Sequence, residues 1–330
     1  GIISVWRKTA VKAILYKDKK PVLCELPRPE PQDGEVLIKV HAAALNRADL
    51  LQREGNYPPP PGVTQVPGLE VAGTVEACPS GKLKKGEKVC ALLPGGGYAE
   101  YACISEGMTM PVPENLTMQE AASLPEAFAT AYLNLFGEGN AKAGETLLMH
   151  AGASGLASVV IPMAKVFGLR VITSVLSEEK KRAVAHLGAD AVIDTSRESV
   201  PAFLKREAER GHPVDIAIDC LGDNMLGESL PYVNRGCRWI VIATLAGDLT
   251  EIDLRNVYMK GIRLIGSTLR SKPQAKKEEI LAALVKTVWP KIGAWLLKPT
   301  VCAEFPLEEA EAAQQLLYDG KNVGKVVLNL

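Results

Sequence analysis

Residues 145–168, ETLLMHAGASGLASVVIPMAKVFG, decide the fold of this chain. Thr146 to Met149 is a short apolar run, which is typical of a buried parallel strand. A turn of small residues follows at 151–155, and then an apolar stretch typical of a helix, which Gly168 ends as a C′ glycine. A strand, a small-residue turn and a helix together predict the first unit of a dinucleotide-binding fold. The small side chains let a pyrophosphate approach the backbone, and N–H groups at the helix start hold its charge.

This motif has a second interpretation. Its spacing is Ala151-x-x-Ser154-x-x-Ala157 rather than Gly-x-Gly-x-x-Gly. Any tight connection between a strand and a helix produces a similar pattern, so the stretch alone leaves both interpretations open. The rest of the chain favours the first.

Composition bounds the class of protein. A length of 330 residues predicts two domains, and 47% hydrophobic with 23% charged residues is ordinary for a soluble globular protein. The formal net charge is zero, so no nucleic-acid partner is expected. Seven scattered cysteines without a Cys-x-x-Cys pair predict reduced thiols in the cytoplasm, not a disulfide frame or a zinc ribbon. No apolar run reaches the roughly 18 residues of a membrane span, and residues 1–10 look like an extension, not a secretory signal.

Short strands fill the first third of the chain. Between glycine and proline turns, strands are predicted at 11–15, 22–26, 35–43, 68–75, 88–93 and 98–104, which indicates a barrel-like β domain. A short helix is predicted at 46–53, before a stiff proline loop at 58–62. From about Thr117 to Gly137 the pattern is helical.

From Glu145 onward, strands and helices alternate. Strands are predicted at 146–149, 171–175, 191–194, 215–219, 238–243 and 264–266, and helices at 177–187, 200–210 and 224–233. This alternation predicts a parallel sheet with helices on both faces. Helices at 276–289 and 308–318 and a last strand at 325–330 suit the first domain better. We therefore predict an α/β protein with a discontinuous first domain, 1–125 and 271–330, and a second domain at 126–270.

Several short motifs occur in the same order and at the same spacing as in a known protein family. The chain resembles the zeta-crystallin-like quinone oxidoreductases of the medium-chain dehydrogenase/reductase superfamily, from about residue 11 to the end. The markers are Asn46-Arg-Ala-Asp49, Arg53-x-Gly55-x-Tyr57, Pro67-Gly-x-Glu70-x-x-Gly73-x-Val75, Pro125-x-x-x-x-Thr130-Ala131, Thr268-Leu-Arg-Ser271 and Asn322-Val-Gly-Lys325. The loop from Gln52 and the stretch from Thr268 are similar to the stress-induced subgroup. The resemblance implies a GroES-like β-barrel catalytic domain, a Rossmann domain and a homodimer.

The resemblance also allows a prediction of whether the protein binds a metal ion. Zinc-dependent relatives carry His after the Pro-Gly pair and a ligand Cys after the third main strand, where this chain has Leu69 and the loop Ala44-Leu-Asn-Arg. Without those ligands no Lewis acid polarises an alcohol, so we expect no metal and no alcohol dehydrogenation. An electron-poor quinone or conjugated enone remains a suitable acceptor. For Glu70, a hydrogen-bonding structural role is favoured over catalysis.

The end of the predicted second strand favours NADPH. NAD enzymes place Asp or Glu there to hold the ribose hydroxyls, whereas residues 173–177 contain no acid. Ser177 and Lys180 follow at a helix start, where a hydroxyl, a cation and N–H groups suit a 2′-phosphate. Ser177 is also interpretable as an ordinary N-cap, and the two roles are compatible. Glu178 and Glu179 argue against a phosphate unless they point outward.

The resemblance supplies further cofactor residues. It adds Lys180 as the phosphate partner, and Thr130, Ser154, Gly155, Leu156 and Asn322 for the pyrophosphate and nicotinamide. Leu245 and Leu269 follow strand ends on the carboxyl side of the sheet, where a doubly wound sheet holds its ligand.

Hydride transfer to a quinone needs proximity, alignment and exclusion of water more than an acid or a base. We therefore expect no nucleophile or triad. Asn46, Asp49 and Tyr57, which belong to the family markers, are predicted as the catalytic cleft residues, and the resemblance places Tyr57 at the cleft. Tyr57 is expected to stack on a flat acceptor or to hydrogen-bond its oxygen. Its alternative is packing against the proline loop.

Three positions depart from the family pattern. Ala157 replaces the last glycine of the fingerprint and should be tolerated. Pro162 removes a helical hydrogen bond and predicts a kink or an early break near Ser158. Thr195 occupies a place where relatives often have Tyr beside the cofactor phosphate, which weakens the NADPH prediction.

These observations predict a zinc-independent NADPH:quinone reductase. One alternative is an NADPH-dependent reductase of α,β-unsaturated carbonyls. The other is an NADPH-binding protein with a structural or regulatory role and little turnover.

Overall fold

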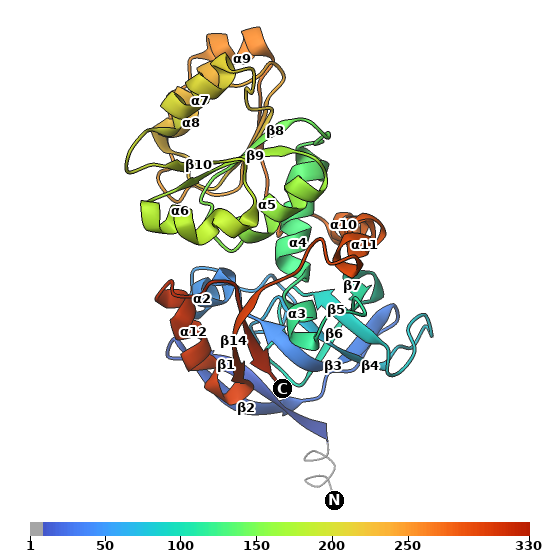
Figure 1. Cartoon of the computed structure of the whole chain (residues 1–330). Helices are drawn as coiled ribbons and strands as arrows, with labels where there is room; N and C mark the ends of the chain where they lie inside the picture. The colour runs from blue at the N-terminus through green and yellow to red at the C-terminus, as the bar shows by residue number, and fades with distance from the viewer. Residues whose placement is uncertain (1–8) are drawn as a thin grey trace, which may run out of the picture. The chain divides into compact units, whose positions relative to one another are not determined.

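The computed structural model describes residues 9–330, which form two compact units (Figure 1). The first comprises the described residues up to Ala127 together with Gln274–Leu330, and the second is Phe128–Pro273. The predicted extension at 1–10 lies outside the described residues except for Thr9 and Ala10. None of the described helices is long and apolar enough to cross a membrane.

The first unit is built mainly from strands. A hairpin of β1 and β2 turns at Asp18 and Lys19, whose positive φ angles of 50° and 59° suit a tight two-residue turn. A seven-stranded sheet has the order β14-β15-β3-β4-β5-β7, with β6 paired to β3. The strands are β1 (Ala10–Lys17), β2 (Lys20–Pro27), β3 (Glu35–Ala44), β4 (Glu70–Ala77), β5 (Lys88–Leu92), β6 (Tyr101–Ser105), β7 (Thr109–Pro111), β14 (Val301–Pro306) and β15 (Lys325–Asn329).

Short helices accompany this sheet, and α4 carries the chain into the second unit. They are α2 (Arg47–Arg53), η1 (Glu106–Met108), α3 (Met118–Ala122), α4 (Pro125–Tyr132), α10 (Gln274–Thr287), α11 (Trp289–Gly293), η5 (Leu307–Glu309) and α12 (Ala310–Tyr318). The strand β15, from the end of the chain, pairs antiparallel with β3. The C-terminal segment therefore brings its side chains next to those that follow β3.

The second unit is a six-stranded parallel sheet of order β10-β9-β8-β11-β12-β13. Figure 1 shows α5 and α6 on one face of it and α7 and α8 on the other. Its strands are β8 (Thr146–Met149), β9 (Arg170–Val175), β10 (Ala191–Asp194), β11 (Ile216–Asp219), β12 (Arg238–Val241) and β13 (Arg263–Gly266). Its helices are η2 (Leu133–Glu138), α5 (Ala157–Val166), α6 (Glu178–Val184), η3 (Ala185–Leu187), α7 (Val200–Glu209), α8 (Asp223–Ser229), η4 (Leu230–Tyr232) and α9 (Leu254–Lys260).

The core of this sheet explains why these segments are strands. Leu148, Ile172 and Trp239 belong to one buried apolar cluster, which α7 joins through Leu204 and α8 through Leu226. Continuous apolar runs covered on both faces are what a parallel sheet requires. The prediction of an α/β protein with a β domain and a doubly wound domain is confirmed.

Pro162 does not break α5. The helix runs from Ala157 to Val166 with Pro162 inside it, so the predicted early break near Ser158 is wrong. Ile161 and Met163, on either side of the proline, are fully buried. Their packing keeps the segment helical despite the lost hydrogen bond.

Candidate functional site

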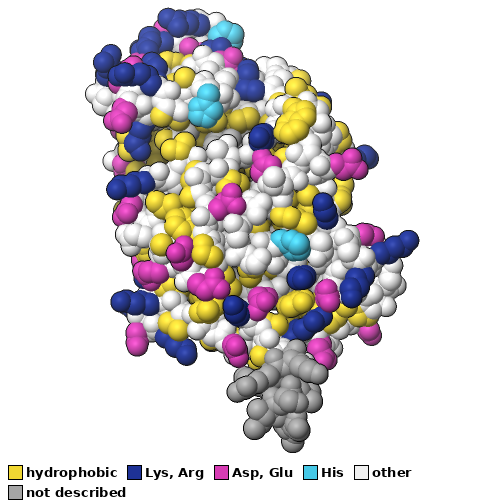
Figure 2. All heavy atoms as spheres, turned by 60° about the horizontal axis from the view of Figure 1, so that its bottom comes forward, with side chains coloured by type: hydrophobic (Ala, Val, Ile, Leu, Met, Phe, Trp, Pro, Cys, Tyr) yellow, Lys and Arg dark blue, Asp and Glu magenta, His cyan; other side chains and the backbone are white. Residues whose placement is uncertain are grey.

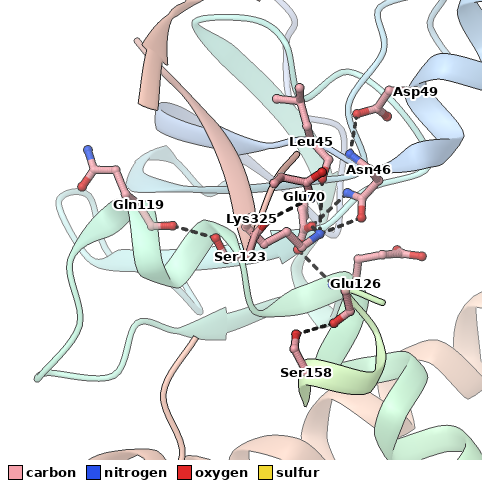
Figure 3. Close-up of polar contacts among 12 residues, drawn as sticks. Leu45, Asn46, Asp49, Glu70, Gln119, Ser123, Glu126, Ser158 and Lys325 are labelled. Carbon is pink, nitrogen blue, oxygen red and sulfur yellow. Dashed lines mark hydrogen bonds and ion pairs between the residues drawn. The ribbon is translucent and has the colours of Figure 1, made fainter. Parts of the chain in front are cut away.

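A buried carboxylate organises the polar residues of the first unit. Glu70, at the start of β4, is fully buried (Figure 3). Its Oε2 accepts hydrogen bonds from Asn46 Nδ2 at 2.9 Å and from Lys325 Nζ at 2.6 Å. Its Oε1 accepts one from the backbone N–H of Glu126 at 3.1 Å. Glu70 thereby joins the loop after β3, the last strand of the chain and the start of α4, the hydrogen-bonding role that the sequence favours.

Lys325 supplies the cation of this cluster. Its ammonium also donates to Asn46 Oδ1 at 2.7 Å and to the carbonyl of Leu45 at 3.3 Å. Three contacts use all three N–H groups of a lysine. The ammonium therefore neutralises Glu70 and fixes the Asn46 side chain.

Asp49 lies deeper than Asn46 and stabilises the start of α2. Its Oδ2 accepts hydrogen bonds from Tyr98 Oη at 2.6 Å and from the backbone N–H of Asn46 at 2.9 Å. The carboxyl is buried, and burial raises its pKa to about 6, against the hydrogen bonds from Tyr98 and Asn46 that lower it. The structure thus brings the predicted residues Asn46 and Asp49 together, with Asn46 the more accessible of the two.

Glu126 is a further acid beside this cluster. Burial and the neighbouring Glu70 carboxylate raise the pKa of the Glu126 carboxyl to about 7, although Lys325 opposes the shift. The side chain is only partly buried. In Figure 3 the carboxyl extends away from Glu70 rather than toward it.

The two remaining predicted residues of this unit lie in loops. Tyr57 is partly buried in the loop after α2. Asn322 precedes β15, and its Nδ2 donates to the carbonyl of Gly324 at 3.1 Å. This bond shapes the turn that leads into Lys325. Gly324 has a φ of 126° and a Cβ there would lie 2.7 Å from the carbonyl oxygen of Thr300, so only glycine suits this turn.

In the second unit, the turn between β8 and α5 is held against the neighbouring strand. A Cβ on Gly152 would lie 2.6 Å from Thr173 Oγ1 of β9. Gly155 is exposed, and no described heavy atom lies within 4 Å of the position that its Cβ would take. Ser154 Oγ accepts a hydrogen bond from the N–H of Ala157 at 3.1 Å, and Leu156 follows directly before α5. The turn therefore offers open backbone at the start of a ten-residue helix, which suits an anion.

The ends of β9 and β10 bring the predicted phosphate residues close together. Ser177 is the N-cap of α6, and its Oγ accepts a hydrogen bond from the N–H of Lys180 at 3.2 Å. Thr195, which follows β10, donates from Oγ1 to the carbonyl of Val175 at 3.0 Å. Lys180 and Thr195 are both exposed. The corner thus combines two hydroxyls, a cation and a helix start next to each other.

The other predicted cofactor residues of this unit are spread more widely. Thr130 lies on α4, and its carbonyl accepts a hydrogen bond from Asn134 Nδ2 at 2.9 Å. Leu245 follows β12 and is exposed, whereas Leu269 follows β13 and is buried. Because Ser154, Ser177, Thr195, Leu245 and Leu269 all follow carboxyl ends of parallel strands, they share one edge of the sheet. That edge is where doubly wound sheets bind ligands.

Three residues of the polar cluster were not predicted as site residues, namely Glu70, which was expected only in a structural role, Glu126 and Lys325. Glu126 carries no signal of its own, since only Pro125 and Thr130 around it are family markers. Lys325 is part of the marker Asn322-Val-Gly-Lys325, which was available in the sequence. Its pairing with Asn46 and Glu70 depends on the alignment of β15 with β3, which no local pattern reveals.

Two family models match the chain. Residues 32–114 match the alcohol dehydrogenase GroES-like domain, and residues 155–286 match the zinc-binding dehydrogenase domain. The first match lies in the strand-rich unit, and the second lies mainly in the six-stranded doubly wound unit. Together they define the class of the protein as medium-chain dehydrogenase/reductase.

Individual relatives show to which family within this class the chain belongs. The quinone oxidoreductase of Rattus norvegicus is 32% identical over 310 residues, which are 92% of this chain and 91% of the rat protein. A mycobacterial quinone oxidoreductase structure matches with a TM-score of 0.86 and 28% identity over 97% of this chain and 100% of that one. The quinone oxidoreductase of Thermus thermophilus, also solved in complex with NADPH, matches with a TM-score of 0.79 and 31% identity over 97% and 100%. The chain belongs to the quinone oxidoreductase family and is an oxidoreductase.

Proposed function

We propose that this protein is a zinc-independent NADPH:quinone reductase that transfers hydride directly from the nicotinamide to the quinone. The observation that carries the proposal is the corner of Ser177, Lys180 and Thr195 on the same sheet edge as the open turn at Gly155. NADPH in the Thermus thermophilus relative and the name of the rat relative support it.

The residues of the second unit fit NADPH. A pyrophosphate would be held by the N–H groups of the turn at Gly155 and Leu156 and by the Ser154 hydroxyl, where the start of α5 attracts negative charge. A 2′-phosphate is held by Ser177 and Lys180, with the Thr195 hydroxyl beside them. Thr130, Leu245, Leu269 and Asn322 complete the proposed cofactor residues.

Zinc, in contrast, does not fit the polar cluster of the first unit. The oxygen atoms that a metal would need at Asn46 and Glu70 already accept hydrogen bonds from the Lys325 ammonium. The Lys325 ammonium, which is bonded to both of these side chains, would repel a zinc cation. Among residues 9–330, no three His, Cys, Asp or Glu side chains are grouped as metal ligands would be. The zinc-binding dehydrogenase match covers residues 155–286 and includes neither Asn46 nor Glu70.

The chain's residues then position and enclose the acceptor. Bound NADPH supplies the hydride and its two electrons. Asn46, locked by Lys325 and Glu70, presents a fixed amide to an acceptor oxygen, and Asp49 holds the backbone of Asn46 in place. Tyr57 offers a flat ring to a flat acceptor. Fixed dipoles of this kind favour charge that develops on the acceptor oxygen.

Steady-state oxidation of NADPH tests this function. We expect turnover with ortho- or para-quinones to exceed turnover with conjugated enones, and no loss of rate on treatment with a zinc chelator. Faster turnover of enones would identify a reductase of α,β-unsaturated carbonyls instead. Tight NADPH binding without turnover of any acceptor would identify a structural or regulatory role.

We also propose that two copies associate and that the protein works in the cytoplasm. The strand β13 is an edge of the parallel sheet, paired only with β12 in the described chain. Leu254 and Tyr258 of α9 and Leu264 of β13 are 70%, 67% and 44% exposed, which is costly unless another chain covers them. All seven cysteines are free thiols, as suits a reducing compartment. Figure 2 shows basic and acidic side chains interspersed over most of the visible face, which does not favour a nucleic-acid partner.

A further inference from the structure

The first unit contains a cavity that the proposed reaction does not use. Its volume is about 740 Å³, within the range of roughly 300–1,000 Å³ that small-molecule sites have in proteins. The residues that line it all belong to the first unit. Among the described residues of its lining there is none of Asn46, Asp49, Tyr57 and Glu70. The cavity is therefore large enough for a ligand of its own.

Strands β1 and β6 give the cavity an apolar lining. Val11 and Ala13 of β1 and Ala102 and Ile104 of β6 line it, and all four residues are buried. Leu26, near the end of β2, adds a partly buried side chain. Apolar surface of this kind binds the apolar part of a ligand, because both surfaces are removed from water.

A loop held against a glycine turn forms another part of the lining. The N–H of Gly96 donates to the carbonyl of Val66 at 2.7 Å, and the N–H of Val66 donates to Thr64 Oγ1 at 3.2 Å. A Cβ on Gly95 would lie 3.1 Å from Val63 Cγ1, so the loop and the turn are in close contact. The fold itself therefore holds this part of the lining in place.

The charged residues of the lining are acidic. They are Asp33 and Glu35, and no Lys, Arg or His side chain among residues 9–330 lines the cavity. Glu35 Oε1 accepts a hydrogen bond from the N–H of Gln32 at 2.8 Å, which holds its carboxylate against the loop before β3. Within the same described range neither carboxylate forms a salt bridge. Two negative charges without a basic partner favour a cationic ligand over an anionic one.

Cys103 of β6 also lines the cavity and adds no charge to it. Burial and the Glu35 carboxylate raise the pKa of the Cys103 thiol to about 11, although Arg28 opposes the shift. A protonated thiol behaves as a small apolar side chain. Arg28 itself is engaged elsewhere, since its guanidinium lies 4.3 Å from the centre of the Tyr101 ring and 3.5 Å from Glu76 Oε1.

We propose that this cavity is a second ligand site, which binds an amphipathic amine with its apolar body against β1 and β6 and its ammonium group beside Asp33 and Glu35. Burial of the apolar body supplies most of the binding free energy, because contacts between partly exposed charges contribute little. The two carboxylates select for the sign of the ligand's charge. Binding requires neither NADPH nor a quinone, so this inference does not depend on the proposed function.

The test compares three probes with the same decyl chain, namely decylamine, decanol and decanoate. Each is titrated calorimetrically into the full chain without cofactor, below the concentration at which it forms micelles. Decylamine should bind about 10-fold more tightly than decanoate, with decanol between them. A higher salt concentration should narrow this difference, because it screens the two carboxylates. Equal binding of the three probes, or binding of none, would overturn the proposal.

A charge variant tests the role of the two acids. Asp33→Asn combined with Glu35→Gln removes both charges and keeps an oxygen for the Gln32 N–H. It should weaken decylamine binding about 5-fold and leave decanol binding unchanged. The matched control is Asp18→Asn with Glu114→Gln, which removes two exposed acids of the first unit outside the lining. It should bind all three probes as wild type does.

A space-filling variant tests the place of binding. Cys103→Phe puts a larger side chain into the cavity and should weaken the binding of all three probes about 10-fold or more. Cys302→Phe, at an exposed cysteine of β14, is its control and should bind as wild type does. Thermal unfolding of each variant shows whether its fold is intact, and the charge variant decides the question if Cys103→Phe unfolds. Decylamine binding that is unchanged in the charge variant, or in a folded Cys103→Phe, would show that the amine binds elsewhere.

Discussion

At the scale of single residues, the proposed recognition of the NADPH 2′-phosphate depends on Lys180. Its side chain is exposed in the first turn of α6, the helix that Ser177 caps, and Thr195 follows the neighbouring strand β10. We expect Lys180→Ala to raise the KM for NADPH by about 10-fold or more, since one charge-assisted contact to phosphate is lost. NADH lacks the 2′-phosphate, so its KM should stay nearly unchanged.

The control for this experiment is Lys181→Ala, which removes a neighbouring exposed lysine of the same helix. It should leave both KM values near wild type. Equal changes for NADPH and NADH in Lys180→Ala would show that Lys180 does not recognise the 2′-phosphate.

Asp49 makes stability depend on pH. Burial raises the pKa of its carboxyl from 3.8 to about 6, so the folded protein binds this proton more tightly than the unfolded chain. The carboxyl therefore stabilises the fold fully below pH 3.8, and this contribution is lost as pH rises to about 6. Asp49→Asn keeps an oxygen for Tyr98 and for the Asn46 N–H but cannot ionise.

We expect Asp49→Asn to be more stable than wild type by about 2–3 kcal/mol at pH 8 and nearly equal to it at pH 3.5. Thermal unfolding of both proteins across this range measures the difference. A gap that is constant with pH would mean that the carboxyl of Asp49 has the same pKa in the folded protein and in the unfolded chain.

At the scale of elements, the sequence predicted those whose apolar pattern is buried. The strands β8, β9 and β11 are fully or almost fully buried runs, and they were predicted within a residue or two. The helix α9 was missed because none of its residues is buried, so no amphipathic period marks it. The edge strand β14 was also missed, and none of its residues is fully buried either.

The residues of the candidate site also divide into those that the sequence predicted and those that it did not. Ser177 was predictable from a local signal, the start of a helix, and Asn46 from the family marker Asn46-Arg-Ala-Asp49. The partners of Asn46 were not, because Glu70 lies on the next strand and Lys325 near the end of the chain. Only the pairing of β3 with β4 and β15 brings them together. The helical conformation at Pro162 was also not predictable from local sequence. It depends on the burial of Ile161 and Met163, which outweighs the hydrogen bond that proline removes.

At the scale of the whole molecule, the proposed dimer depends on the edge formed by β13. Two copies that pair their β13 strands in antiparallel orientation would cover Leu264 and the apolar side chains of α9 with one symmetric contact. Leu264→Glu places one negative charge on each copy at this contact. The two charges should repel each other across the symmetric interface. Because Leu264 is already 44% exposed, the substitution should cost the isolated fold little.

We expect sedimentation to give twice the chain mass for wild type and the single mass for Leu264→Glu at the same concentration. Leu23→Glu is the matched control, since Leu23 is an exposed leucine on β2 of the first unit, at 39%. It should remain dimeric. Wild type at the single mass, or a dimer that survives Leu264→Glu, would show that β13 is not the contact. Dissociation in both variants would instead indicate that the fold, rather than the edge, was damaged.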